Sequence, residues 1–173
     1  MKYRILATSV LVLVVAFLQS TICEYIEFLS IRPNLFIVML VIVALLRNPV
    51  ESAVMGVLLG LSFDILMGKS LGWYGLLFFL ISIPISSVNE KIYREKFLVL
   101  FAFTFLSTLI IELMFYLIIF LFKDYGNLPY VFSRIVLPES IYNSILVLPL
   151  FGPISKAYTL IDSFDRRRNR LSA

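Results

Sequence analysis

Long runs of apolar residues, separated by short segments that carry the charges, make up most of this chain. A helix rises about 1.5 Å per residue, so about 20 residues cross the hydrocarbon core of a bilayer. The charges divide the chain into runs that we expect to be helical at 5–23, 33–46, between Glu51 and Lys69, between Lys69 and Glu90, at 97–122 and at 135–155. The pattern therefore predicts an all-α integral membrane protein with six transmembrane helices.

The second run is short for a membrane span. Its residues from Pro33 to Leu46 would rise only about 21 Å as a helix. We expect it to recruit its flanks, with Arg32 and Arg47 extending their side chains to the interfaces, or to thin the membrane locally. Pro33 suits the start of a helix, where its missing N–H is not needed.

The first run superficially resembles a secretory signal peptide. It is longer than a usual signal-peptide core, and no small residues follow at cleavage spacing. The segment before Cys23 is also a poor lipoprotein cleavage box, because the bulky Ile22 precedes the cysteine. We therefore expect an uncleaved first membrane helix.

The composition supports a protein immersed in lipid. The chain has 173 residues, of which 61% are hydrophobic and 15% are charged, and its mean hydropathy is +0.98. Soluble domains are about half apolar and about a quarter charged, so a soluble domain, a nucleotide-binding fold, a disulfide scaffold and a disordered chain are all excluded. We expect a transmembrane domain over residues 1–159 and a basic cytoplasmic tail over 160–173.

The lysines and arginines predict the orientation, since cytoplasmic loops carry an excess of them. With both termini in the cytoplasm, four cations lie outside, namely Arg32, Lys69, Lys123 and Arg134, and the other eleven of the 15 lie inside. The net charge of +4 gives no signal for nucleic acid, because no aromatic residues interleave the basic ones. The basic cluster Asp165–Arg170 is either an anchor on anionic lipid or a docking tail for a cytosolic partner.

Three acidic residues lie within the predicted spans, where a charge is costly unless it faces protein or water. Asp64 belongs to a stripe with Gly56, Gly60 and Gly68 at intervals of four residues, and Glu112 and Glu139 lie in later helices. Small residues at this spacing let helices approach closely in a membrane. The acids are expected in the outer half of the bilayer or, for Glu112, near its middle, where they could meet one another or the bases Lys69 and Arg134.

The neighbours of these acids extend the polar faces. Thr104, Thr108, Glu112 and Tyr116 share one face of the fifth predicted helix, and Pro138, Glu139 and Asn143 lie together on the sixth. We therefore expect the third, fifth and sixth predicted helices to pack with their polar faces inward. Both a purely structural role and a contact with a partner or ligand remain open for these groups.

Catalytic motifs are missing from the sequence. It contains no histidine and a single cysteine, Cys23, and therefore no zinc cluster, no serine–histidine pair and no intrachain disulfide. Asp64 lacks the preceding glycine of an intramembrane aspartyl protease, and no second aspartate is comparably embedded. We expect no enzyme activity, no cofactor and no metal.

Several motifs, in this order, resemble the family of the rod shape-determining protein MreD. They are Gln19, Arg32-Pro33-Asn34-Leu35, Gly56-x3-Gly60-Leu61-x2-Asp64-x3-Gly68, Leu71-Gly72 and Leu137-Pro138-Glu139-x3-Asn143-x5-Pro149-Leu150. The resemblance covers nearly the whole chain in length, span count and motif order. Pro33, Gly60, Asp64, Gly68, Pro138 and Asn143 match the recurrent residues of that family, whereas the turn Arg47-Asn48-Pro49-Val50 departs from its glycine-containing turn.

The resemblance implies a non-catalytic subunit of the cell-elongation machinery in the bacterial inner membrane. MreD-like proteins bind the scaffold MreC and work beside RodA, a class B penicillin-binding transpeptidase and MreB. Their fold is similar to the six-helix substrate-binding subunits of energy-coupling-factor vitamin transporters. The sequence leaves two alternatives, a solute-binding transporter subunit and an intramembrane protease. The first would retain a vitamin and an ATPase module through purification.

Overall fold

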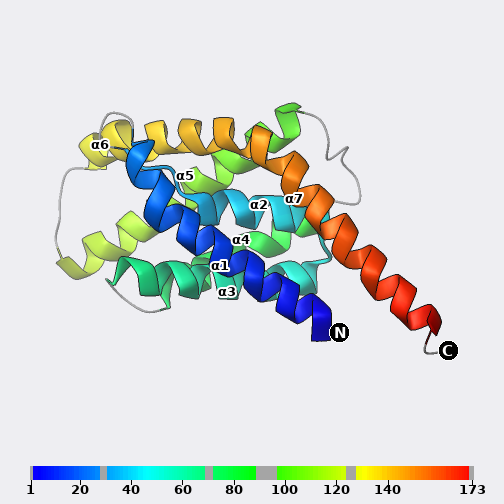
Figure 1. Ribbon diagram of the computed structural model, residues 1–173. Helices are drawn as coiled ribbons and strands as arrows, with labels where there is room; N and C mark the ends of the chain where they lie inside the picture. Colours follow the sequence, from blue (N-terminus) through cyan, green and yellow to red (C-terminus); the bar gives the residue numbers. More distant parts are fainter. Residues whose placement is uncertain (1, 28–30, 69–71, 89–96, 124–127, 172–173) are drawn as a thin grey trace.

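Helices make up nearly all of the chain that the computed structural model describes, which is residues 2–27, 31–68, 72–88, 97–123 and 128–171 (Figure 1). The elements are α1 (Lys2–Tyr25), α2 (Leu35–Leu46), α3 (Pro49–Met67), α4 (Trp73–Val88), α5 (Phe97–Lys123), α6 (Leu128–Val131), the π-helix η2 (Phe132–Val136) and α7 (Leu137–Leu171). The six predicted runs correspond to α1 to α5 and α7. The expected all-α fold with six long helices is therefore confirmed over these residues.

The described helices fall into two groups by length. Three segments are long and apolar enough to cross a membrane, namely Pro49–Met67, Phe97–Ile118 and Leu128–Ser163. Three shorter apolar helical segments accompany them, namely Val10–Thr21, Leu35–Leu46 and Trp73–Val88. The length and composition of these helices make the chain a membrane protein.

The shortest of the six long helices, α2, lies at the centre of the bundle. Its residues from Phe36 to Leu45 are all buried, and it contacts α1, α3, α4, α5 and α7. A helix of 12 residues rises only about 18 Å. Because the other helices cover α2, its length does not have to match the hydrocarbon thickness, and no local thinning is needed to explain it.

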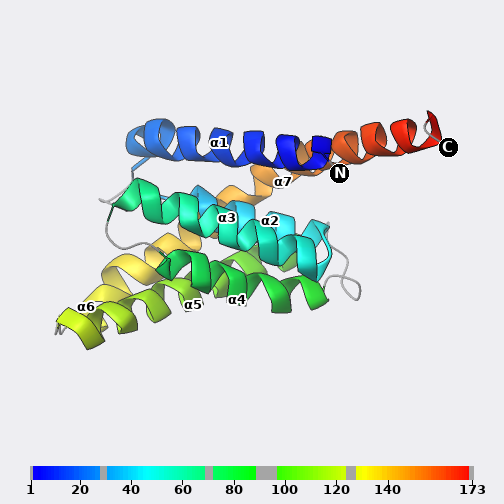
Figure 2. The same cartoon turned by 90° about the horizontal axis from the view of Figure 1, so that it is seen from below.

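Two closely packed helix pairs flank α2. α3 packs most extensively against α4, and α5 packs against α7 (Figures 1 and 2). The expected packing of the third predicted helix against the fifth and sixth is wrong, because the described part of α3 contacts α1, α2 and α4 and neither α5 nor α7. The reason lies in the glycine stripe, which faces α4.

The last long helix extends further than the sequence predicts. α7 runs to Leu171 rather than ending near Ser155, although Pro149 and Pro153 lie inside it. Its final turns, drawn in red, project beyond the other helices (Figure 1). The residues expected to form a separate tail thus begin as a continuation of this helix.

The two ends of α2 define two ends of the bundle. We call them the Asn34 end, where α2 begins, and the Arg47 end, where it stops. The start of α1 and the end of α7 both lie toward the Arg47 end (Figure 1), as an even number of crossings requires, and the location of the termini in the cytoplasm stays a prediction. Four of the cations that predict it, Lys69, Lys91, Arg94 and Lys96, lie outside the described residues.

Candidate functional site

The glycine stripe brings α3 into backbone contact with α4. A Cβ atom placed on Gly60 would lie 2.5 Å from the Tyr74 carbonyl oxygen and the Gly75 Cα. A Cβ on Gly56 would lie 2.7 Å from the carbonyl oxygen of Phe78. Only residues without side chains fit these positions, so this stripe serves the packing of the chain itself.

The carboxylate of Asp64 closes the start of α4. It accepts hydrogen bonds from the backbone N–H groups of Gly72 at 2.9 Å, Gly75 at 3.2 Å and Tyr74 at 3.3 Å. The first N–H groups of a helix lack partners within the helix, and the helix dipole favours a negative charge there. Asp64 is buried, and its charge is therefore satisfied by the N-terminus of the neighbouring helix.

Gly68 has a different role from the other glycines of the stripe. It ends α3 in the left-handed conformation, with φ of 61°, and its N–H donates to the carbonyl oxygen of Asp64. A Cβ on Gly68 would meet nothing within 4 Å. Backbone conformation rather than close packing requires glycine here.

A network of neutral side chains holds the chain at the Asn34 end. The side chain of Asn34 caps α2 by accepting from the N–H groups of Phe36 and Ile37. Gln19 of α1 accepts from the Leu35 N–H at 2.8 Å and donates to the Pro33 carbonyl at 3.0 Å. Pro33 thus lies buried inside a segment that α1 fastens from the side.

Asn143 joins this network from α7. Its side-chain oxygen accepts from the Asn34 N–H at 2.8 Å, and its amide donates to the Thr108 hydroxyl of α5 at 3.3 Å. The buried amide of Asn143 therefore links α2, α5 and α7. The sequence did not reveal this contact between Asn34 and Asn143.

Pro138 follows a widened helical turn. The π-helix η2 ends with the Leu137 N–H donating to the Phe132 carbonyl. A proline in the next position cannot donate, and its ring crowds the carbonyl four residues back. This wide turn immediately precedes Glu139, and Ile135 within it lines the cavity described next.

A cavity of about 560 Å³ opens at the Asn34 end. Its polar lining includes both Glu112 of α5 and Glu139 of α7, and the Tyr74 hydroxyl donates to the Glu112 carboxylate at 3.4 Å. The full lining is Gln19, Ser20, Ile31, Arg32, Pro33, Asn34, Phe63, Leu66, Met67, Tyr74, Glu112, Ile135 and Glu139. Of the three acids, two therefore meet at the cavity, and Asp64 does not line it.

Of the two bases expected beside the acids, only Arg134 can be placed, and it does not reach them. Lys69 lies outside the described residues, and Arg134 is exposed and does not line the cavity. Arg32 lies at the rim, where its Nε is 2.7 Å from Glu27 Oε2.

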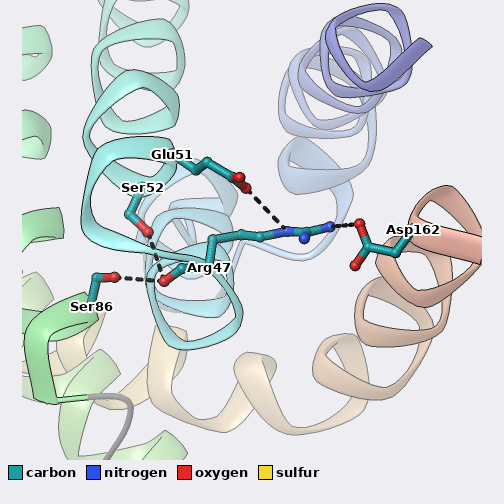
Figure 3. A network of polar contacts seen from close by, with 5 residues as sticks. All are labelled: Arg47, Glu51, Ser52, Ser86 and Asp162. Carbon is teal, nitrogen blue, oxygen red and sulfur yellow. Dashed lines mark hydrogen bonds and ion pairs between the residues drawn. The ribbon is translucent and has the colours of Figure 1, made fainter. Parts of the chain in front are cut away.

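The Arg47 end is closed by an ion-pair network that sequence reasoning missed (Figure 3). Arg47 Nη2 lies 2.9 Å from Asp162 Oδ1 of α7, and its Nε lies 3.7 Å from Glu51 Oε2 of α3. The guanidinium also lies over the Tyr158 ring, 4.7 Å from its centroid. The spacing of Arg47 and Glu51, one helical turn apart, is the feature of the sequence that could have predicted their ion pair.

The backbone of Arg47 takes part in the same network. Its carbonyl oxygen accepts from the Ser86 hydroxyl of α4 at 2.6 Å and from the Ser52 hydroxyl of α3 at 3.4 Å (Figure 3). This residue therefore connects α2 to α3, α4 and α7. From the sequence we had expected of this residue a turn, a contribution to orientation and a side chain that extends to the membrane interface.

The comparisons with known proteins identify a family. The model of the family described as rod shape-determining protein MreD matches residues 2–161. No curated protein and no solved structure matches the chain significantly. The matched range includes every residue of the cavity, of the α3–α4 contact and of the Asn34 network.

Proposed function

The chain belongs to the family of the rod shape-determining protein MreD, and from this premise we propose that it binds the scaffold MreC as a non-catalytic subunit of the cell-elongation complex. The family match and the apolar helices together make it a membrane protein of the cell-shape system. The match over residues 2–161 is the observation that carries the proposal.

The proposed assembly lies in the bacterial inner membrane and supports peptidoglycan synthesis. Its further members are RodA, a class B penicillin-binding transpeptidase and MreB. We keep the prediction of six crossings with both termini in the cytoplasm. In this orientation the Arg47 end faces the cytoplasm, where MreB lies, and the cavity faces the side on which peptidoglycan is made.

Partner binding in this proposal uses the lipid-facing surface. The face of α3 that carries Gly56 and Gly60 is covered by α4, so a partner helix has to pack elsewhere. α1 carries large apolar side chains that the rest of the protein does not cover. Among them are Leu13, which is 68% exposed, and Phe17, which is 65% exposed. Helices associate in lipid by van der Waals packing and interhelical hydrogen bonds, and a single-span protein such as MreC fits this mode.

Affinity isolation of the chain from its native membranes tests the proposal. We expect recovery of MreC together with cell-wall synthases. Gly60→Leu should abolish this recovery because it separates α3 from α4. Gly152→Leu is the control, since a Cβ on Gly152 meets nothing within 4 Å. Normal MreC recovery and rod shape with Gly60→Leu at wild-type protein level would contradict the proposal.

The cavity favours one second candidate, a solute-binding subunit of a transporter. Its volume falls within the roughly 300–1,000 Å³ typical of ligand sites. Such a subunit would carry a pair of ATPases through the same isolation in place of MreC. The identity of the recovered companions therefore discriminates between the two candidates.

A further inference from the structure

The helix α4 runs from one end of the bundle to the other. At the Asn34 end, the Asp64 carboxylate accepts from the N–H groups of Gly72 and Gly75. At the Arg47 end, the Ser86 hydroxyl donates to the Arg47 carbonyl oxygen at 2.6 Å. Both ends of α4 are therefore fixed to other helices, and α4 connects the two polar ends of the bundle.

This helix is short for a membrane crossing. Its 16 residues rise about 24 Å, whereas the hydrocarbon core of a bilayer is about 30 Å thick. Trp73–Val88 is accordingly among the apolar segments that fall below the length of a span. The helix cannot begin earlier, because Gly72 has a φ of 104°, which no α-helix contains. α4 is thus about 6 Å too short for an average bilayer, and any tilt increases this mismatch.

An apolar face of α4 is left uncovered by the rest of the protein. Leu76, Phe79 and Leu80 are 52%, 38% and 52% exposed. α4 contacts α2, α3 and α5 but neither α1 nor α7, and it lies on the outside of the bundle (Figure 2). The equally short α2 is covered by other helices, so it does not have to match the lipid. The length of α4, in contrast, has to match it.

Interfacial residues mark the two limits of this face. Trp73 begins α4, and tryptophan is enriched where membrane and water meet. In the last turn, the exposed Ser87 donates its hydroxyl to the Ile83 carbonyl oxygen at 2.8 Å. Glu90 and Lys91 follow in the sequence. From Trp73 to Ser87 the helix rises only about 21 Å, so the apolar band on α4 is narrower than the helix itself.

The neighbouring helix α5 has no such mismatch. Its 27 residues rise about 40 Å, and its part Phe97–Ile118 is long and apolar enough to cross a membrane. Two adjacent helices therefore require different thicknesses of hydrocarbon. A bilayer accommodates a short apolar segment by thinning beside it, at a modest cost for each ångström of mismatch.

We propose that the apolar face of α4 is a lipid-docking surface for a locally thinned bilayer, which binds phospholipids with short acyl chains in preference to those with long ones. The lipids along α5 have no such preference. The thinning expected beside the second run of the sequence thus occurs beside α4. The inference rests on the length of α4 and not on binding of MreC, so each can fail without the other.

Fluorescence of Trp73 tests the proposal, because this is the single tryptophan of the chain and it begins α4. The full chain is reconstituted in fluid bilayers in which brominated dioleoyl-phosphatidylcholine, a contact quencher of tryptophan, competes with one unbrominated lipid. The competitors are dimyristoleoyl-, dioleoyl- and dierucoyl-phosphatidylcholine, which share a headgroup and differ in chain length. We expect the dimyristoleoyl lipid to bind at least about fivefold more tightly than the dierucoyl lipid.

A second reporter position and two matched variants assign the preference to α4. Trp73→Phe with Phe120→Trp moves the tryptophan to an exposed position on α5, where the preference should fall below about twofold. Ser87→Leu widens the apolar band of α4 and should reduce the preference at Trp73 by about half. Ser62→Leu is the control, since it removes an exposed hydroxyl that donates to the Leu58 carbonyl oxygen in the same way, at 2.7 Å, but within α3.

The outcomes distinguish a property of α4 from a property of the whole protein. A short-chain preference at Trp73 that is absent on α5, and that Ser87→Leu but not Ser62→Leu reduces, supports the proposal. Equal affinities of the three lipids at Trp73 would overturn it, and so would the same preference at both reporter positions. Complete protection of Trp73 from the brominated lipid would also overturn it, because a second copy of the chain would then cover α4.

Discussion

The three acids within the helices lie in two different settings, the α3–α4 pair and the cavity on the α5–α7 side. In the first, glycines remove all space between two backbones, and Asp64 receives three N–H groups. In the second, Glu112 and Glu139 share a cavity of about 560 Å³. A carboxylate that accepts from the backbone N–H groups at a helix start stabilises the fold, whereas a buried carboxylate placed near a second one is costly to the fold.

Of the changes considered, Gly60→Leu should disturb the packing of α3 against α4 most. Its Cβ alone would lie 2.5 Å from backbone atoms of α4, so the two helices must separate. We expect a loss of about 3 kcal/mol or more in the free energy of unfolding, measured by denaturant titration in detergent micelles. Gly152→Leu should change it by less than about 0.5 kcal/mol, and equal effects at both glycines would refute the close-contact explanation.

Asp64→Ala tests whether the Asp64 carboxylate stabilises the fold by capping the start of α4. It leaves three N–H groups at the start of α4 without their acceptor, and we expect a loss of about 2–3 kcal/mol in the free energy of unfolding. Asp64→Asn, which keeps one acceptor oxygen and loses the charge, should fall between Asp64→Ala and the wild type. Unchanged thermal unfolding of the alanine variant would show that Asp64 does not close the helix.

A double-mutant cycle at the Arg47 end measures how much the ion pair between Arg47 and Asp162 contributes to the free energy of unfolding. Arg47→Met keeps the apolar stem, removes the contact with Asp162 at 2.9 Å, and should cost about 1–2 kcal/mol. Asp162→Asn should add little in the Arg47→Met background, because the two side chains act on each other. Fully additive effects on the unfolding midpoint would exclude a coupled pair.

Gly68→Ala gives the smallest expected effect. The φ of 61° at this position disfavours any residue with a Cβ, and we expect a cost of about 1 kcal/mol. Gly68→Asn should cost less, because asparagine adopts the left-handed conformation more readily. Gly152→Ala provides the control in a thermal unfolding assay, and a loss there as large as at Gly68 would argue against a conformational cause.

The positions of the helices could be predicted from the sequence with small errors, except that α7 continues to Leu171 instead of ending near Ser155. The predicted 97–122 helix is α5 (Phe97–Lys123), and the predicted 33–46 helix is α2 (Leu35–Leu46). Apolar runs bounded by charges specify where a helix lies along the chain. They do not specify its neighbours, because leucine and valine face lipid and protein equally well. The central position of α2 was therefore not predictable from its composition.

The candidate site was predictable in its residues and not in its arrangement. Asp64, Glu112 and Glu139 stood out because each is an acid in an apolar run. Their separation into two settings depends on backbone N–H groups at the start of α4, which no side-chain pattern reveals. The pairing of Arg47 with Asp162 likewise joins residues 115 positions apart, and neither one alone is unusual near a helix end.

Unfolding of the double variant Glu112→Gln/Glu139→Gln is the most direct test of the claim that Asp64 stabilises the fold and the two cavity acids do not. Both changes remove charge while keeping an acceptor for the Tyr74 hydroxyl. The free energy of unfolding in detergent should stay at the wild-type value or rise, since the amides carry no charge that burial or mutual repulsion could penalise. A loss as large as that of Asp64→Ala would show that the cavity acids also hold the fold, and would contradict this account.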